Sequence, residues 1–155
     1  MHMLKFGDEM QYLPFVISLD DNIDNELNIR IALAWRGTAV SPDTGNSALD
    51  DILSKAVPVY PDPDNIYDIC FSDYILYQVR NESYCCLGSR ETKIGKGLVI
   101  YSRSFLLDHL SESTLCVKND EGSSFPGDWV HYGIHSENHV IDIISCSEPI
   151  ISKVL

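Results

Sequence analysis

The chain has 155 residues, of which 45% are hydrophobic, a length and composition that suit one domain with a packed core. Its 23 acidic and 11 basic side chains give a formal net charge of −12. This charge argues against nucleic acid and anionic membranes as partners, because both present phosphate, and it favours basic proteins or cations. The excess of acidic side chains lies mainly before Arg80. A net charge far from zero also keeps a small domain soluble.

The first part of the chain predicts two strands separated by an acidic turn. Residues 12–19 form a short apolar run in which Pro14 delays the start of the strand or places it at an edge. Residues 20–26 are acidic and poor in apolar side chains, so they predict a loop. Residues 28–35 predict the second strand, whose shared face carries Ile29, Ile31, Leu33 and Trp35.

Residues 47–56 carry the strongest helix pattern. Ser47 can cap the free amides of the first turn while Asp50 reaches back to it. The apolar residues that recur at helical spacing are Leu49, Ile52, Leu53 and Ala56. Pro58 ends the helix, and residues 59–67 predict a stiff, acidic connection because their prolines hold the backbone extended.

Residues 68–83 form the longest run that predicts a strand, and the sheet is expected to grow around it. Alternate residues of a strand point to the same face, and one face of this strand would start at the preceding residue. It would carry Tyr67, Ile69, Phe71, Asp73, Ile75, Tyr77 and Val79. Asp73 is the only polar residue among them, so it either lies in a bulge with Ser72 or is buried beside Arg80 or Arg103. A structural role for Asp73 is favoured over a functional one.

The second half of the chain predicts further strands and one more helix. Residues 84–97 are rich in turn-forming residues around Gly88, and Ser102 or Ser104 can cap the helix. The expected elements are a strand at 98–101, a helix at 105–110, a loop at 118–128, a strand hairpin at 129–135 and 139–144, and a tail at 148–155 along the sheet. The fold class is therefore α+β, one domain over residues 1–155 with a mostly antiparallel sheet and two or so short helices. Met1 and His2 are set aside as a cloning remnant.

No metal, cofactor or catalytic motif is complete. His131, His135 and His139 recur every four residues, but Gly133 favours strands over the helix that a zinc protease needs, although two of these histidines can approach across a hairpin. The loop from Asp20 lacks the glycine and the glutamate of a calcium site.

Two other constellations are also incomplete. Ser104, Asp108 and His109 have the residue types of a hydrolytic triad, but the last two are sequence neighbours that point different ways on a helix. Cys85 and Cys86 have no cationic setting that would mark a reactive thiol.

The cysteines and the hydropathy predict a cytoplasmic protein. Five cysteines, an odd number without a Cys-x-x-Cys pair, suit a reducing compartment. No apolar stretch approaches the roughly 20 residues that span a bilayer, and the N-terminus does not follow the pattern of a secretion signal.

Residues 71–151 contain three segments with a family pattern: FSDYILYQVRNESY, GKGLVIYSRSFLLDHL and HYGIHSENHVIDIISCSEPII. Together they resemble small bacterial immunity proteins found at contact-dependent growth inhibition and polymorphic toxin loci. The resemblance implies a protein that binds a cognate toxin domain, with no active site to transfer. Size, acidity and cysteine usage agree with that role.

The implied function is stoichiometric inhibition, in which an acidic surface docks on the basic active-site cleft of a nuclease toxin and excludes its substrate. The acids that loops present to a partner without desolvation in the free state are Asp20, Asp21, Asp24, Glu26, Asp62 and Asp64. No nucleic acid, membrane or cofactor is expected.

Two other functions stay open. A small hydrolase would need Asp73, Glu82 and one of the C-terminal histidines to converge in a pocket. An assembly protein would form a homo-oligomer through an apolar face, such as the tail at residues 148–155.

Overall fold

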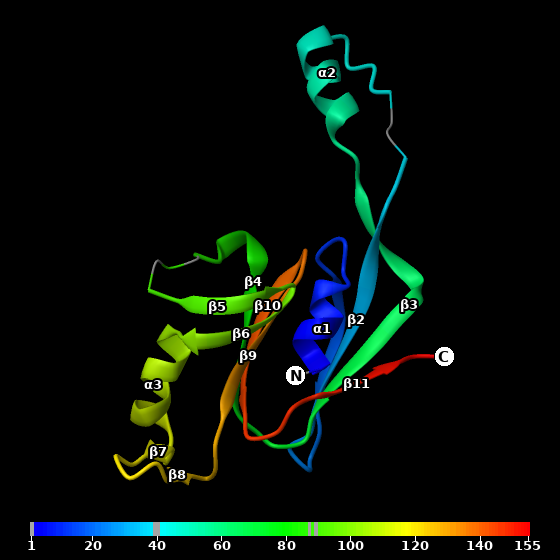
Figure 1. Cartoon of the computed structure of the whole chain (residues 1–155). Helices are drawn as coiled ribbons and strands as arrows, with labels where there is room; N and C mark the ends of the chain where they lie inside the picture. The colour runs from blue at the N-terminus through cyan, green and yellow to red at the C-terminus, as the bar shows by residue number, and fades with distance from the viewer. Residues whose placement is uncertain (1, 39–40, 87, 89) are drawn as a thin grey trace.

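The computed structural model describes residues 2–38, 41–86, 88 and 90–155, and Figure 1 follows them from the blue N-terminus to the red C-terminus. The helices are α1 (His2–Asp8), α2 (Ser47–Lys55) and α3 (Phe105–Ser113), with the short 3-10 helix η1 (Glu82–Tyr84). The strands are β1 (Phe15–Asp21), β2 (Leu27–Arg36), β3 (Val59–Phe71), β4 (Tyr74–Asn81), β5 (Thr92–Lys96), β6 (Leu98–Arg103), β7 (Val117–Lys118), β8 (Ser124–Phe125), β9 (Val130–His135), β10 (His139–Ser145) and β11 (Ile150–Lys153).

Two antiparallel sheets form the body of the protein. The first has the strand order β1-β2-β3-β11, the second has the order β4-β10-β9-β6-β5, and β7 pairs with β8 in a separate ribbon. All pairings among the described strands are antiparallel. The predicted α+β class is therefore confirmed, with two sheets in place of the one expected.

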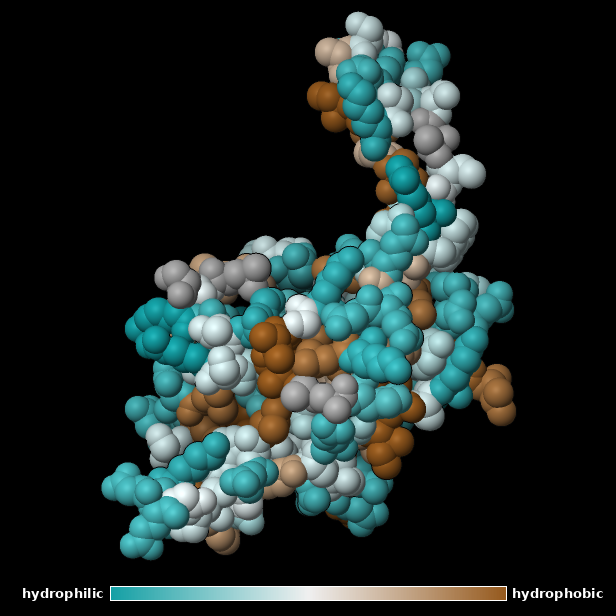
Figure 2. Space-filling view, in the orientation of Figure 1, coloured by the Kyte–Doolittle hydropathy of each residue, from teal (hydrophilic) through white to brown (hydrophobic). Residues whose placement is uncertain are grey.

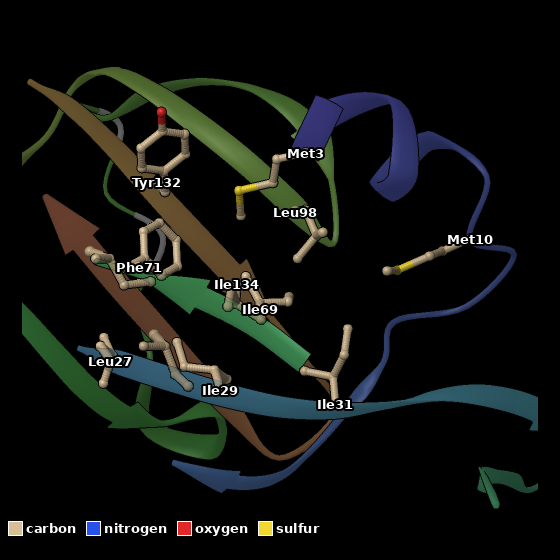
Figure 3. Packing of buried hydrophobic residues seen from close by; sticks show 12 residues of the cluster. Met3, Met10, Leu27, Ile29, Ile31, Ile69, Phe71, Leu98, Tyr132 and Ile134 are labelled. Atoms are coloured by element: carbon tan, nitrogen blue, oxygen red, sulfur yellow. The ribbon is translucent and has the colours of Figure 1, made fainter. Parts of the chain in front are cut away.

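The main core lies between these two sheets (Figure 3). The first sheet contributes Leu27, Ile29, Ile31, Ile69 and Phe71, and the second contributes Leu98, Tyr132, Ile134, Ile141 and Ile143. Met3 of α1 and Met10 complete the cluster. Removal of this apolar surface from water is the main stabilising contribution, at roughly 25 cal/mol per Å².

The outer face of the second sheet is covered in part by α3. Leu106 and Leu110 of this helix pack against Ile144 of β10, whose neighbours Ile141 and Ile143 face the main core because strand side chains alternate. Ser104, one of the two expected caps, is the residue that caps the helix. Its hydroxyl oxygen accepts a hydrogen bond from the amide of Leu107 at 3.1 Å.

The predicted central strand at residues 68–83 is wrong as a single element, because the chain passes from one sheet to the other in the middle of it. β3 ends at Phe71 in the first sheet and β4 begins at Tyr74 in the second. The polar, exposed pair Ser72 and Asp73 makes the connection, and the carbonyl of Asp73 accepts hydrogen bonds from Ser145 Oγ at 3.0 Å and from the amide of Cys146 at 3.1 Å. The expected parity still holds for Ile69, Phe71 and Tyr77, which all contribute to the core.

The predicted connection at residues 59–67 is also wrong, because these residues belong to β3. Pro61 pairs with Ala34 of β2 beyond a register shift that follows Ala32. Proline is tolerated there because, past the bulge, this end of β3 has β2 as its only partner among the described strands. β2 and β3 thus extend beyond the sheet and carry α2 away from the body (Figure 1).

The remaining sequence predictions agree with the structure in outline. The first strand begins after Pro14 and includes Asp20 and Asp21, which were expected in the loop. The hairpin of β9 and β10 is confirmed, and the tail lies along the first sheet as β11, where Ile151 pairs with Ile69. The turn-rich segment before β6 includes β5.

Candidate functional site

The six predicted binding acids fall into two groups. Asp20 and Asp21 end β1, and Asp24 and Glu26 lie in the turn to β2. All four are exposed. Asn22 organises this turn: its Oδ1 accepts hydrogen bonds from the amides of Asp24 at 2.9 Å and Glu26 at 3.0 Å.

Asp62 and Asp64 form the second group, near the start of β3. Asp62 accepts hydrogen bonds from the side chain of Asn65 at 2.8 Å and the amide of Asp64 at 2.9 Å, and these bonds hold its pKa below the usual range. Phe71, at the end of β3, pairs with Leu27 and so lies beside the turn that holds the first group. A strand rises about 3.3 Å per residue, so Asp62 lies roughly 30 Å away from Phe71 along β3. The structure therefore does not bring the six acids into one site.

Asp73 joins the first group, although neither sequence expectation for it was correct. Asp73 is exposed rather than buried. Arg80, one of its expected partners, pairs instead with Asp142 at 2.7 Å. A pocket of about 490 Å³ is lined by Asp24, Asn25, Ser72, Asp73, Tyr74 and Ile75. We call Asp20, Asp21, Asp24, Glu26 and Asp73 the acidic end.

Two tyrosines of β4 fix one carboxylate of the acidic end. The hydroxyl of Tyr74 donates to Asp21 at 2.9 Å, and that of Tyr77 lies 3.3 Å from the same oxygen. Burial, and then the hydrogen bond and charge of Asp21, raise the pKa of Tyr74. The carboxylate is thus held in place by neutral donors that stay protonated at neutral pH.

Two of the three histidines, His131 and His135, belong to a polar network on the outer face of the second sheet, whereas His139 begins β10 outside it. His131 Nδ1 lies 2.7 Å from Ser104 Oγ, and its Nε2 lies 3.3 Å from Asp142 Oδ1. Asp142 also accepts hydrogen bonds from Gln78 at 2.9 Å and Arg80 at 2.7 Å. Burial raises the pKa of Asp142, but these hydrogen bonds and the charge of Arg80 outweigh it and hold the pKa below its usual range.

Ser104, His131 and Asp142 thus have the residue types of a hydrolytic triad. They differ from the set considered in the sequence, which was Ser104, Asp108 and His109. Each of the three is at most 2% exposed, and the serine hydroxyl already accepts the amide of Leu107. A substrate has no access to the serine oxygen, so the arrangement ties β4, β9, β10 and the start of α3 together.

His135 lies at the edge of the same network. Its Nε2 is 2.8 Å from the hydroxyl of Tyr101, and the ammonium of Lys93 lies 3.3 Å from its Nδ1. An ammonium can only donate a hydrogen bond, so Nδ1 accepts it and carries no proton. The imidazole is therefore neutral. Burial and the charge of Lys93 lower the pKa of His135 to about 4.

The arrangement that a hydrolase would need is not formed. Asp73 precedes the first residue of β4 and Glu82 follows the last, so the length of the strand separates them. Glu82 borders a cavity of about 170 Å³ with Cys85 and His135, without Asp73. Across the described ranges 2–38, 41–86, 88 and 90–155, no three His, Cys, Asp or Glu residues are grouped to hold a metal ion.

Comparisons of the chain with protein-family models, curated proteins and solved structures match none of them. Within the described part of the chain, every helix is too short or too polar to cross a membrane. The candidate site is therefore defined by its own geometry: at the acidic end, Asp24 and Asp73 line a pocket.

Proposed function

We propose that this protein is an immunity protein that binds a cognate toxin domain, a basic nuclease, in the cytoplasm and neutralises it by covering its active site. The observation that carries the proposal is the pocket of the acidic end. Two carboxylates, Asp24 and Asp73, reach it from separate turns, and none of its six lining residues is basic. Such a pocket suits the side chain of an arginine or a lysine.

The acidic end is also rigid before it binds. The hydroxyls of Tyr74 and Tyr77 hold Asp21, and Asn22 holds the turn that carries Asp24. A partner therefore has few side chains to order on binding, and this preorganisation lowers the entropy lost in the complex.

Charge supplies both the recognition and the inhibition. A nuclease holds the phosphates of its substrate with lysine and arginine side chains, and the carboxylates of the acidic end would take the place of those phosphates. With a net charge of −12, the protein also attracts a basic partner before contact, which raises the association rate at low salt.

The proposal is tested by expressing this chain with the C-terminal domain encoded directly upstream of it, with a tag on one of the two. A one-to-one complex in which nuclease activity is silenced is the expected result. The double variant Asp24→Lys, Asp73→Lys should abolish both capture and inhibition. Its control, Asp62→Lys with Asp64→Lys, makes the same change in net charge at the far end of β3 and should retain them. Full inhibition by the Asp24, Asp73 variant would refute the proposed site.

A further inference from the structure

α2 presents an apolar face that the rest of the chain does not cover. No residue of this helix is buried, and Ile52 is 64% exposed. The other apolar residues of this face are Leu49 and Leu53, and Ala56 follows at the C-cap. They recur at positions i, i+3, i+4 and i+7, the spacing with which an amphipathic helix enters a groove on another protein.

A groove of matching character lies between α3 and β7. It has a volume of about 580 Å³, and its apolar lining consists of Leu107, Leu110, Leu115, Cys116, Val117 and Trp129. Leu115 is 83% exposed and Val117 is 50% exposed, so water covers much of this surface in the isolated chain. Apolar side chains gathered in one exposed groove make it a candidate interaction site.

The chain cannot fill its own groove with α2. Figure 1 places α2 at one end of the molecule and α3 with β7 at the other. Figure 2 shows the same separation, with brown apolar side chains on the projecting element. A second copy of the chain brings the helix and the groove together, and two copies related by a twofold axis make the contact twice.

We propose that two copies of this chain form a dimer in which α2 of each copy docks into the α3–β7 groove of the other. This inference goes beyond the proposed function, because neither the helix nor the groove contributes a residue to the pocket of the acidic end. In this dimer the apolar face of α2 and the α3–β7 groove cover one another.

The apolar area available is enough for a small specific interface. A large aliphatic side chain offers roughly 100 Å² of apolar surface, so the exposed parts of one helix face and one groove amount to roughly 350 Å². Two reciprocal contacts bury roughly 700 Å² of apolar surface, or about 1,200 Å² in total when the polar rim is included. This is the lower end of specific interfaces, so we expect a weak dimer with a dissociation constant in the micromolar range.

Charge gives the dimer a distinctive salt dependence. On a helical wheel Asp51 lies opposite the apolar face and Asp50 lies beside it, so docking leaves both in water. Among the described residues that line the groove, Lys118 is the one that carries a charge. Each copy carries a net charge of −12, so the two repel one another, and added salt should strengthen the dimer by screening this repulsion.

The test is sedimentation equilibrium of the full chain from about 1 to 300 µM, at low and high salt. The wild type should pass from monomer to dimer in this range. Ile52→Asp in the helix and Leu115→Asp in the groove should each raise the dissociation constant at least about tenfold. Ile23→Asp is the matched control, since Ile23 is 95% exposed and belongs to neither surface, and it should not change the constant.

A mixture of the two variants gives the sharpest result. The Leu115→Asp protein keeps an intact helix and the Ile52→Asp protein keeps an intact groove, so their heterodimer retains one of the two contacts. The mixture should therefore associate more strongly than either variant alone. Circular dichroism of the three variants verifies that each one folds.

Three outcomes would overturn the dimer. They are a wild type that stays monomeric up to 300 µM, a dimer that Ile52→Asp does not weaken, and a mixture that shows no rescue. A monomeric wild type whose Ile52→Asp variant fails to capture the toxin domain would assign α2 to that partner instead. None of these outcomes bears on Asp24 and Asp73, whose variants are tested by toxin capture.

Discussion

The side chain of His135 is held as a neutral imidazole between Tyr101 and Lys93. Tyr101 and Lys93 contact its ring nitrogens, and Gly133 leaves room for the tyrosine ring, since a Cβ there would lie 2.8 Å from Tyr101 Cε2. Burial, followed by the charge of Lys93, lowers the pKa of His135 to about 4. Its titration is therefore linked to folding.

The stability of the protein should fall as the pH drops from about 6.5 to about 4. In this window the unfolded chain binds a proton at His135, with an ordinary pKa near 6.5, while the folded chain does not. The contribution is complete above pH 6.5, and after allowance for solvent at the ring edge it amounts to about 1–2 kcal/mol. Urea unfolding of the wild type and of His135→Gln across this range measures it. A variant with the same pH slope as the wild type would contradict the assignment.

Asp142 should be the most costly single carboxylate to remove. It is 1% exposed and accepts hydrogen bonds from Gln78, Arg80 and His131, so Asp142→Ala leaves three donors unpaired. The expected loss in the free energy of unfolding is about 3–5 kcal/mol. The control is Asp68→Ala, which breaks a more exposed pair with Arg30 and should cost about 1 kcal/mol or less. Equal losses in denaturant unfolding would contradict the difference in burial.

The sequence could predict only some of these individual roles. The exposed acids of the β1–β2 turn follow from a segment without apolar residues. The contact of Ser104 with His131 does not, because 27 residues separate them and only the register of β6 and β9 brings them together. Asp142 carried one usable signal: it alternates with Ile141 and Ile143, so it must face the side opposite to the main core.

At the scale of the elements, the cap of α2 differs from the one that the sequence predicts. Ser47 and Asp50 matched a capping pattern, yet the residue that caps the helix is Asn46, whose Oδ1 accepts the amides of Ala48 at 3.1 Å and Leu49 at 3.2 Å. Asp50 instead accepts the amide and hydroxyl of Thr44. The loop before the helix thus takes part in its first turn.

Asn46→Ala should loosen α2, whereas Ser47→Ala should not. The lost cap costs about 1 kcal/mol, and since no residue of the helix is buried the loss is local rather than global. Hydrogen exchange at the amides of Ala48 and Leu49 reports it directly. Faster exchange in Ser47→Ala than in Asn46→Ala would contradict the assignment of the cap.

Periodicity identified most elements but not their partners. The parity of residues 67–79 was read as one face of one strand, but the chain divides it between two strands in different sheets. Ile69, Phe71 and Tyr77 face the main core. Ile75 packs instead against the cluster around α3, and Val79 is exposed. Likewise, the spacing of Leu49, Ile52 and Leu53 predicts an amphipathic helix whether the chain covers it or not. A pattern of this kind identifies a face that needs burial, and only the tertiary structure shows whether it is buried.

For the whole molecule, the two surfaces proposed to bind partners include opposite ends of the protein. The acidic end combines Asp24 and Asp73 in a pocket, while α2 projects from the opposite end with an uncovered apolar face. The net charge and the acidic turn were evident in the sequence. The addition of Asp73 was not, because it depends on where β3 ends and β4 begins. The separation of Asp62 from the turn was not either, because it depends on β3 extending from Val59 to Phe71.

The most direct measurement of the central claim is the association rate of this protein with the upstream toxin domain, measured by stopped flow over a range of salt. The account predicts a rate that falls steeply as salt rises, and a loss of at least about tenfold at low salt in the Asp24→Lys, Asp73→Lys variant. The Asp62→Lys, Asp64→Lys variant, with the same net charge, should lose much less. Equal losses in both variants, or a rate independent of salt, would contradict docking at the acidic end.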